Sequence, residues 1–252
     1  MPDDFCWYEL MTTDRKAAAA FYESVVGWRS QEAGSVMPYT LLSVGGVQVA
    51  GMIELPEEAC KAGARPSWIG YIAVDNVDTY AKRVTEAGGS IHRPPADIPN
   101  IGRFAVVADP QGAAFVLFTP DGTPDVRAEP RSIGTVAWHE LLAGDGASAF
   151  AFYSNLFGWS KSQAMDMGPM GIYQLFTAGK GDIGGMMTKT PEMPVPFWLY
   201  YVVVDAIDAA TARVKDKGGK VINGPMEVPG GSWIVQCLDP QGAMFALTAA
   251  GR

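Results

Sequence analysis

The sequence predicts an α+β protein that consists of two copies of one domain, and two observations lead to this prediction. Residues 7–28 and 138–159 share the pattern Trp-x-Glu-Leu, Asp, Phe-Tyr and Gly-Trp, with the same intervals between its members. Residues 109–113 and 239–243 both read Asp-Pro-Gln-Gly-Ala. A repeated unit of about 120 residues is too long for a solenoid repeat and has the size of a domain. The chain of 252 residues is therefore predicted to be a tandem duplication.

The two copies are predicted to cover residues 1–121 and 132–252. Residues 120–130 between them are polar and rich in proline and glycine, which is typical of an exposed linker. Hydrophobic residues make up 48% of the chain and charged residues 18%. This composition allows two packed cores and excludes a disordered chain.

The first copy opens with a β-α-β-β-β module. Residues 5–11 are rich in aromatic side chains and predict a strand, and Asp14 is the predicted N-cap of a helix over 17–26 that ends at Gly27. Further strands are predicted near 28–32, 39–44 and 47–55. The glycines at 45 and 46 supply a two-residue hairpin turn between the last two.

A second module of the same order begins at Trp68. It is predicted to contain a strand over 68–74, a helix over 77–87, and strands near 90–93, 103–108 and 113–119. Residues 109–112 carry Asp, Pro and Gly at the positions that a type I turn prefers. The second copy repeats both modules, from about 134 to 187 and from 198 to 248.

Charge and composition exclude several classes of function. A net charge of -8 without a basic cluster would repel a phosphate backbone, so no nucleic-acid partner is expected. No apolar run reaches the 18 or so residues that span a bilayer, and residues 1–4 lack the start of a secretory signal. We therefore expect no membrane association and a cytoplasmic location. Three cysteines, Cys6, Cys60 and Cys237, do not recur between the copies and are expected to be free thiols.

The ordered set of features, occurring twice, resembles the vicinal oxygen chelate superfamily. This set comprises paired β-α-β-β-β modules, an Asp that closes the first strand, the Phe-Tyr and Gly-Trp pairs, and the Asp-Pro-x-Gly hairpin. The superfamily includes glyoxalase I, the bleomycin-resistance proteins and extradiol dioxygenases. The chain is similar in particular to tandem glyoxalase-like proteins of actinobacteria. The resemblance covers both copies and implies that each half forms a cupped sheet of eight strands around a small-molecule pocket.

The resemblance also shows where a metal would be bound, and this sequence departs from the pattern there. In metal-dependent members a His or Gln lies seven residues before the strand-closing Asp, and a Glu lies seven residues after the hairpin Asp. The residues at these positions cannot coordinate a metal: Trp7, Trp68, Val116, Trp138, Trp198 and Ala246. The chain contains two histidines, His92 and His139, and both lie off these positions. We therefore expect no metal and no cofactor.

Large aromatic residues that replace the ligands indicate a different kind of site. An indole is planar and amphipathic, and a pocket lined by such rings suits a flat or apolar ligand. The candidate ligand-binding residues are Trp7, Trp68, Trp138, Trp198 and Tyr200. Strand alternation places Glu9 on the face of Trp7 and Glu140 on the face of Trp138, so both carboxylates are candidate polar anchors. The alternative is that these residues fill the cups, with each Glu bonded to a neighbouring Tyr or a backbone amide.

Three functions follow as hypotheses. The leading one is a small-molecule-binding protein of the glyoxalase/bleomycin-resistance type that uses metal-free cups for sequestration, sensing or resistance. The second is a lyase, an isomerase or a dioxygenase-like enzyme acting on a small carbonyl or aromatic compound. In that enzyme Glu9 or Glu140 would be a general base whose pKa is raised by the apolar cup. The third is an interaction protein with filled cups. A monomer or a homodimer is expected.

Overall fold

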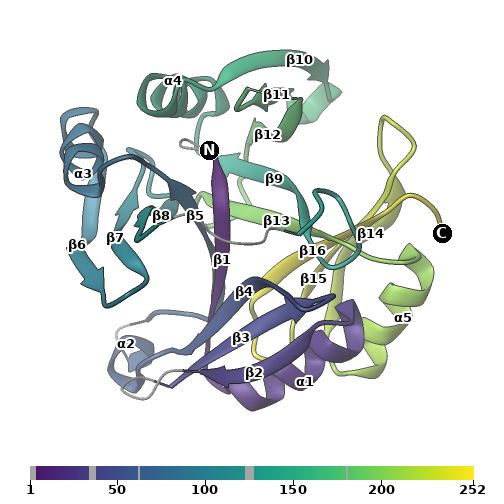
Figure 1. Ribbon diagram of the computed structural model, residues 1–252. Helices are drawn as coiled ribbons and strands as arrows, with labels where there is room; N and C mark the ends of the chain where they lie inside the picture. Colours follow the sequence, from purple (N-terminus) through teal and green to yellow (C-terminus); the bar gives the residue numbers. More distant parts are fainter. Residues whose placement is uncertain (1–3, 34–37, 62, 123–127, 180) are drawn as a thin grey trace. The chain divides into compact units, whose positions relative to one another are not determined.

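The predicted α+β class and the paired β-α-β-β-β modules are confirmed by the computed structural model, which describes residues 4–33, 38–61, 63–122, 128–179 and 181–252 (Figure 1). The first module contains β1 (Phe5–Thr12), α1 (Arg15–Val26), β2 (Arg29–Ala33), β3 (Tyr39–Val44) and β4 (Val47–Glu54). A short helix that the sequence did not predict, α2 (Glu57–Lys61), follows. The second module contains β5 (Ser67–Ala73), α3 (Val77–Glu86), β6 (Ser90–Ile98), β7 (Gly102–Ala108) and β8 (Ala114–Pro120).

The second copy repeats this order of elements. Its first module contains β9 (Val136–Ala143), α4 (Gly146–Phe157), β10 (Ser160–Asp166), the 3-10 turn η1 (Gly168–Met170), β11 (Ile172–Thr177) and β12 (Asp182–Thr188). Its second module contains β13 (Phe197–Val203), α5 (Ile207–Asp216), β14 (Lys220–Glu227), β15 (Trp233–Leu238) and β16 (Met244–Ala249). None of the helices in the described ranges is long and apolar enough to cross a membrane.

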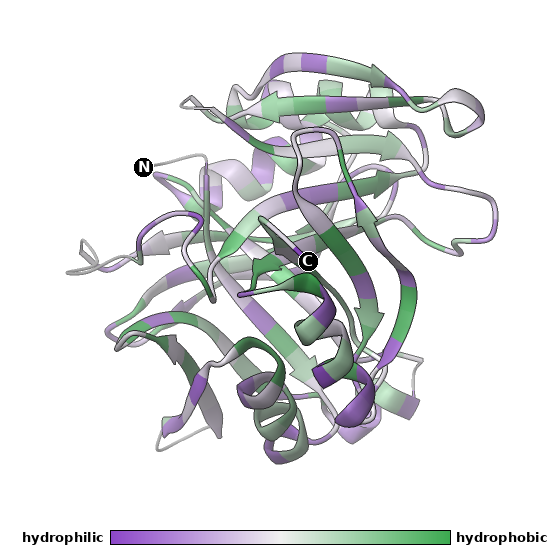
Figure 2. Ribbon diagram, turned by 90° about the vertical axis from the view of Figure 1, so that its right-hand side faces the viewer, coloured by the Kyte–Doolittle hydropathy of each residue, from purple (hydrophilic) through white to green (hydrophobic). Residues whose placement is uncertain are grey.

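The strands form two eight-stranded sheets with the same topology. Their strand orders are β2-β3-β4-β1-β5-β8-β7-β6 and β10-β11-β12-β9-β13-β16-β15-β14. In both sheets the hairpins are antiparallel, whereas β1–β4, β5–β8, β9–β12 and β13–β16 are parallel pairs. Hydrophobic and hydrophilic residues are interspersed along many of the strands in Figure 2, as expected where the two faces of a strand have different surroundings.

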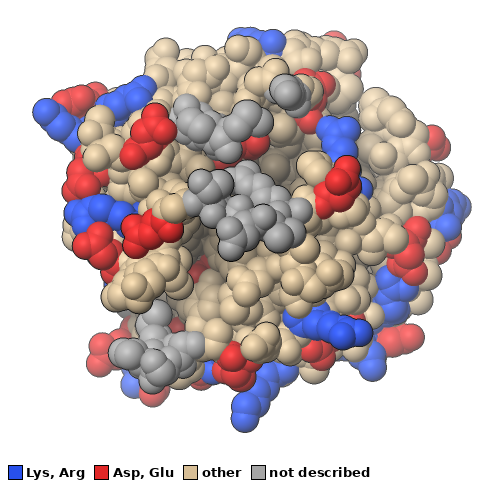
Figure 3. All heavy atoms as spheres, in the orientation of Figure 1, with Lys and Arg blue, Asp and Glu red and all other residues tan. Residues whose placement is uncertain are grey.

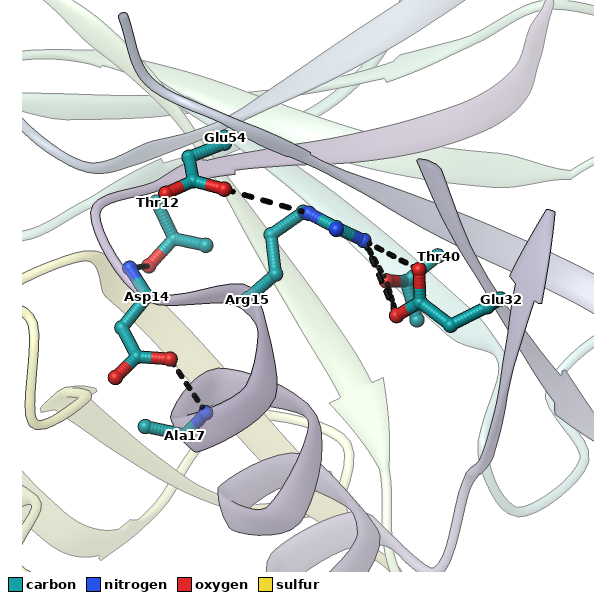
Figure 4. A network of polar contacts seen from close by, with 7 residues as sticks. All are labelled: Thr12, Asp14, Arg15, Ala17, Glu32, Thr40 and Glu54. Atoms are coloured by element: carbon teal, nitrogen blue, oxygen red, sulfur yellow. Dashed lines mark hydrogen bonds and ion pairs between the residues drawn. The ribbon is translucent and has the colours of Figure 1, made fainter. Parts of the chain in front are cut away.

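The first helix of each copy begins and ends as the sequence predicts. The Asp14 side chain accepts a hydrogen bond from the N–H of Ala17, and it thereby satisfies one of the free donors of the first turn (Figure 4). Gly27 ends α1 with a φ of 88°, a left-handed conformation that favours glycine. Asp145 is the N-cap of α4, and Gly158 ends this helix in the same left-handed conformation.

A charged network surrounds the first turn of α1. The guanidinium of Arg15, whose side chain is 10% exposed, donates to Glu32 at 2.9 Å and lies 3.8 Å from the carboxylate of Glu54. The same Nη1 atom donates to the hydroxyl of Thr40 on β3 (Figure 4). Arg15 therefore connects α1 to β2, β3 and β4 of the first module, and α4 has Gly146 at the corresponding position.

The described chain divides into two compact units, and each unit combines parts of both sequence copies. Unit 1 comprises the described parts of Met1–Cys6, Ile69–Pro124 and Trp138–Leu199. Unit 2 comprises the described parts of Trp7–Trp68, Asp125–Ala137 and Tyr200–Arg252. Each unit thus contains one module from each copy. The boundaries at 121 and 132 describe the sequence repeat, and they stay a prediction.

The core of unit 2 lies between the helix-bearing sides of its two modules. Helices α1 and α5 pack against each other, and they lie side by side in Figure 1. Phe21 and Tyr22 of α1 meet the ring of Phe245 on β16 edge-on, with ring centroids 5.7 and 5.3 Å apart. Arg213 of α5 donates to the carbonyl of Val25 at 3.0 Å, which satisfies a free acceptor in the last turn of α1.

Unit 1 is built in the same way from α3 and α4. The ring of Tyr80 on α3 stacks on Phe157 of α4 with a centroid distance of 5.9 Å. Arg83 of α3 donates to the carbonyls of Asn155 and Leu156 at the end of α4. Both units therefore use an arginine of one helix to satisfy the C-terminal carbonyls of the other.

Candidate functional site

An indole, a phenol and a carboxylate come together on the first module. Strand β1 places Trp7 and Glu9 on one face, while Leu10 on the other face is buried in the core of unit 2. The indole Nε1 of Trp7 donates to the hydroxyl of Tyr39 on β3 at 3.1 Å. A further hydrogen bond joins this hydroxyl to the carboxylate of Glu9. We call Trp7, Glu9 and Tyr39 the first constellation.

Burial and charge keep the phenol of Tyr39 protonated. Burial is the larger cause that raises its pKa well above the ordinary value, and the negative charge of Glu9 raises it further. Since the hydroxyl accepts from the indole of Trp7, its own proton is directed to the carboxylate of Glu9.

A glycine on the strand between Tyr39 and Glu9 makes this arrangement possible. Gly51 on β4 pairs with Glu9 of β1 on one side and with Leu41 of β3 on the other. A Cβ atom at this position would overlap the hydroxyl of Tyr39. The absence of a side chain at Gly51 therefore allows the phenol to lie across β4 and reach the carboxylate.

The second copy contains the same arrangement. The indole of Trp138 on β9 donates to the hydroxyl of Tyr173 on β11 at 2.8 Å, and this hydroxyl is hydrogen-bonded to Glu140. Gly185 on β12 pairs with Glu140, and a Cβ atom there would overlap the ring of Tyr173. Burial and the charge of Glu140 raise the pKa of Tyr173 well above its ordinary value. We call Trp138, Glu140 and Tyr173 the second constellation.

The two tyrosines and the two glycines of these constellations were not identified from the sequence. A signal was present, because in both copies the glycine follows the tyrosine at the same interval. The interval from the tryptophan to the tyrosine differs, however. It is 32 positions in the first copy and 35 in the second. The aligned pattern therefore breaks between the first helix of each copy and the strand that carries the tyrosine, and it resumes in a shifted register.

Trp68 and Trp198, which were expected to line the cups, contact helices in the structure. Trp68 donates from Nε1 to the hydroxyl of Tyr22 on helix α1 at 2.8 Å, so its ring faces the helix. Trp198 donates to the hydroxyl of Tyr153 on helix α4 at 3.0 Å and is 4% exposed. Side chains alternate along a strand, so Trp68 lies on the opposite face of β5 from Tyr71.

Each of these two tryptophans begins a buried chain of hydrogen bonds that runs through a tyrosine to a hairpin aspartate. The hydroxyl of Tyr22 donates to Asp239 at 3.1 Å, and the hydroxyl of Tyr153 donates to Asp109 at 3.2 Å. The other oxygen of Asp109 accepts the backbone N–H groups of Gln111 and Ala113, which fixes the predicted turn. Burial raises the pKa of both aspartates. Each chain of hydrogen bonds thus holds a helix of one module against a hairpin of the other module.

Tyr200 lies beside a small cavity in the core of unit 2. Its side chain is 3% exposed and meets the ring of Tyr8 edge-on at a centroid distance of 5.2 Å. The cavity, which Trp68 also lines, has a volume of about 20 Å³, which is room for about one water molecule. A pocket for a drug-sized ligand needs roughly 300 Å³ or more. Trp68 and Tyr200 therefore fill this part of the core.

A much larger groove lies over the hairpin strands of the first module. Its volume is about 670 Å³, and its lining consists of Arg29, Ser30, Gln31, Leu41, Ser43, Gly45, Gly46 and Gln48. Leu41 pairs with Gly51, which pairs in turn with Glu9, so this groove continues the face that carries the first constellation. We call it the β2–β4 groove.

The described residues do not offer a donor set for a divalent metal ion. No three His, Cys, Asp or Glu side chains gather in the described ranges. His139 is turned away from Trp138 and Glu140, stacks on Phe5 at a centroid distance of 4.1 Å, and bonds through Nδ1 to the carbonyl of Ile183 at 2.6 Å. Burial lowers the pKa of His139 to about 4, so the ring is neutral at pH 7. The groups that the two constellations bring together are indole, phenol and carboxylate.

Charged side chains on the face shown in Figure 3 are interspersed in sign, and the basic residues there form no single patch.

The family of the chain follows from comparison with known proteins. The family model described as Glyoxalase/Bleomycin resistance protein/Dioxygenase superfamily matches residues 5–117 and, a second time, residues 133–247. The chain belongs to this superfamily. The resemblance that the sequence motifs indicated is therefore confirmed, and each copy of the repeat is one match to the family.

Curated relatives align with nearly the whole chain. The protein named "Putative glyoxylase CFP32" from Mycobacterium tuberculosis is 35% identical over 246 residues, which cover 96% of this chain and 92% of that protein. "Anthracycline biosynthesis protein DauV" from Streptomyces sp. strain C5 is 30% identical over 260 residues, which cover 96% of this chain and 91% of that protein. The tandem arrangement is thus shared along the length of these proteins.

Solved structures show the same fold at low sequence identity. The Mn(II)-bound glyoxalase from Novosphingobium aromaticivorans superposes with a TM-score of 0.69 at 15% identity, covering 100% of this chain and 83% of that one. The 2,3-dioxygenase LapB from Pseudomonas sp. KL28 superposes with a TM-score of 0.67 at 12% identity, and the match covers 98% of this chain and 92% of that one. These likenesses establish the fold and leave the chemistry to be argued from the residues present.

Proposed function

We propose that this glyoxalase-superfamily protein binds a flat or apolar small molecule at an indole–phenol–carboxylate site, for sequestration, sensing or resistance. The observation that carries the proposal is that one constellation of Trp, Tyr and Glu is built twice. In both copies it depends on a glycine that leaves space for the phenol. The recurrence of the glycine supports a specified position for the phenol beside the carboxylate in both copies.

The three groups of the first constellation offer complementary contacts to such a ligand. Trp7 is only partly buried, and its ring can stack on an aromatic or apolar surface. A carboxylate has about four lone-pair positions, and in this proposal one of those of Glu9 accepts a hydrogen bond from the ligand. A hydroxyl or an amine on the ligand would supply that donor. The site therefore favours a planar molecule that carries a hydrogen-bond donor.

The names of the relatives agree with this class of ligand. The Streptomyces proteins are named for anthracycline biosynthesis, and anthracyclines are polycyclic aromatic compounds that carry hydroxyl groups. The similarity at 30% identity supports an aromatic ligand for this chain without specifying the compound.

Binding can be separated from folding by comparing two tryptophans of unit 2. Planar aromatic alcohols and amines are titrated while tryptophan fluorescence and the melting temperature are recorded. Trp7→Ala should weaken binding by roughly 1 to 3 kcal/mol, because stacked rings contribute about this much. Trp68→Ala should mainly lower stability, because its ring is bonded to Tyr22 in the core. Equal affinity of the wild type and Trp7→Ala would argue against the proposed site.

A catalytic function is the second candidate, and one feature favours it. The carboxylate of Glu9 lies beside a protonated phenol, so the pair combines a possible general base with a hydrogen-bond donor. The name glyoxylase of the mycobacterial relative also points to an enzyme. In this candidate Glu9 or Glu140 removes a proton from a small carbonyl or aromatic compound.

The enzyme and the binding protein differ in the effect of one conservative substitution. If Glu9 is a base, Glu9→Gln should lower turnover of a bound compound by about 10² or more while the compound still binds. If Glu9 only anchors the ligand, the same change lowers affinity and no product forms with either protein. An interaction protein with filled cups would bind none of the compounds and would show neither effect.

A further inference from the structure

We propose that the first constellation is the ligand-accepting site, that the second constellation is its closed structural counterpart, and that the ligand carries an oxygen-rich or anionic arm that lies in the β2–β4 groove. This inference rests on the proposed binding function, and it specifies which copy binds and what chemistry the ligand has.

The two constellations differ in exposure although their geometry is the same. In the first, Glu9, Tyr39 and Leu41 are all partly exposed. In the second, Glu140 is 8% exposed, and Tyr173 and Leu175 are each 9% exposed. Glu9 is thus more exposed than Glu140, whereas Trp7 and Trp138 are both partly exposed. Glu140 and Tyr173 of the second constellation are as buried as residues of the protein core.

The β2–β4 groove beside the first constellation is lined by hydrogen-bond donors. Arg29 contributes a guanidinium, and Gln31 and Gln48 contribute amide groups. The lining contains no Asp or Glu. A guanidinium binds carboxylates and other oxyanions through several N–H groups at once, so this lining favours an acceptor-rich arm.

The second copy lacks this chemistry at the matching positions. Arg29 pairs with Ser43, and Ser43 pairs with Gln48 across the hairpin. The corresponding row of the second copy consists of Ser160, Thr177 and Asp182. A serine thus replaces the arginine, and a carboxylate replaces the amide. An anionic arm would be attracted in the first copy and repelled in the second.

The register of the strands sets the length of the ligand. Glu9, Gly51 and Leu41 lie opposite one another on three adjacent strands. Neighbouring strands are about 4.8 Å apart, so Glu9 lies about 10 Å from the side chain of Leu41 in the groove. Gln31 pairs with Leu41, so the backbone of β2 that carries Arg29 and Gln31 lies one strand farther, about 14 Å from Glu9. A planar ligand with a hydroxyl at one end and a carboxylate about 10 Å away, together with the length of an arginine side chain, spans this distance.

Three matched probes test this arrangement. The first is 6-hydroxy-2-naphthoate, which has both groups, the second is 2-naphthol, which lacks the arm, and the third is 2-naphthoate, which lacks the hydroxyl. Calorimetry with the full chain should give one site per chain for 6-hydroxy-2-naphthoate. Its affinity should exceed that of either partial probe, and it should fall with rising salt because the contact with Arg29 is exposed.

Two substitutions locate the ends of the probe. Arg29→Gln should weaken 6-hydroxy-2-naphthoate about tenfold and leave 2-naphthol unchanged, since one charge-assisted contact is lost. Glu9→Gln should weaken both hydroxylated probes. Ser160→Gln, at the matching position of the second copy, serves as the control and should change neither affinity. Circular dichroism of each variant checks that the fold is retained.

The failures are distinguishable. Two equivalent sites per chain, or an equal effect of Ser160→Gln and Arg29→Gln, would overturn the division of roles between the copies. Equal binding of 2-naphthol and 6-hydroxy-2-naphthoate would overturn the role of the groove. No binding of any probe at millimolar concentration would contradict the proposed binding function itself, and this inference with it.

Discussion

Replacing Gly51 with alanine tests the physical basis of the first constellation. The added methyl group would occupy the space of the Tyr39 hydroxyl, so the phenol must move. The move breaks the hydrogen bond from Trp7, which is worth about 0.5 to 1.5 kcal/mol, and the bond to the ionised Glu9, which is worth about 1.5 to 3. Partial relaxation of the exposed edge of the ring should recover some of this. We expect Gly51→Ala to lower the free energy of unfolding by about 2 to 4 kcal/mol.

A double-mutant cycle isolates the cause of that loss. With Tyr39→Ala in the background, the methyl group at position 51 meets no ring, so Gly51→Ala should cost little or become slightly stabilising in the strand. The free energy of unfolding of the four proteins is measured by urea denaturation followed by circular dichroism. The explanation is refuted if Gly51→Ala alone costs less than about 0.5 kcal/mol, or if its cost is the same with and without the ring of Tyr39.

Three further predictions concern other parts of the chain. Trp68→Ala should lower the free energy of unfolding by roughly 3 to 5 kcal/mol in urea denaturation, since it removes a core ring and leaves Tyr22 without its indole donor. The neutral, buried His139 should make stability fall as pH decreases from about 6.5 towards its native pKa of about 4, by up to about 1.4 kcal/mol per pH unit, because the unfolded chain takes up the proton first. His139→Leu should remove this part of the pH dependence, as urea midpoints across that range can show. Gln111→Met should cost about 1 to 3 kcal/mol by differential scanning calorimetry, because its Oε1 accepts the N–H that begins α4 at 2.7 Å. Gln241→Met should cost less or stabilise, because its buried Oε1 has no hydrogen-bond partner in the described structure.

The contrast between Gln111 and Gln241 has a local cause. Gly144 lies beside Gln111, and a Cβ atom there would approach Oε1 to 2.7 Å. Gly144 directly precedes the N-cap of α4, and Thr13 takes the same place before the N-cap of α1 in the first copy. Thr13 has a side chain at the position where the second copy has none, and the symmetry of the two copies is broken at this point.

The fold could be predicted from the sequence because its signals are local and occur twice. The N-cap at Asp14, the left-handed glycine at 27 and the Asp-Pro-Gln-Gly turn each fix a boundary through neighbouring atoms. The repeat then confirms each assignment a second time. The pairing of modules from different copies into compact units could not be predicted, because two similar modules can pack with either partner and the sequence records no preference.

The candidate site was predicted in part, and the errors have definite causes. Alternation along one strand predicted Trp7 beside Glu9 and Trp138 beside Glu140, and in the structure each pair is hydrogen-bonded to one tyrosine hydroxyl. Their phenolic partners lie two strands away, and such a contact depends on register, which the sequence does not state. Trp68 was expected to line the cup, but its indole donates to Tyr22 of α1, and which face of a sheet a side chain occupies depends on register as well as on alternation.

Duplication explains how one constellation can have two roles. A glycine in a strand costs roughly 0.5 to 1 kcal/mol relative to alanine, so Gly51 and Gly185 are each a local disadvantage that the phenol must offset. In the second copy the contact between Glu140 and Tyr173 is buried, so this contact by itself can offset the cost of Gly185 without a ligand. The first copy has the same disadvantage, yet its carboxylate and phenol remain partly exposed next to a groove that contains Arg29. If the constellation were only a packing device, the first copy would gain stability from closing as the second does. The greater exposure of Glu9 and the adjoining groove that contains Arg29 therefore support our proposal that the first copy binds the ligand.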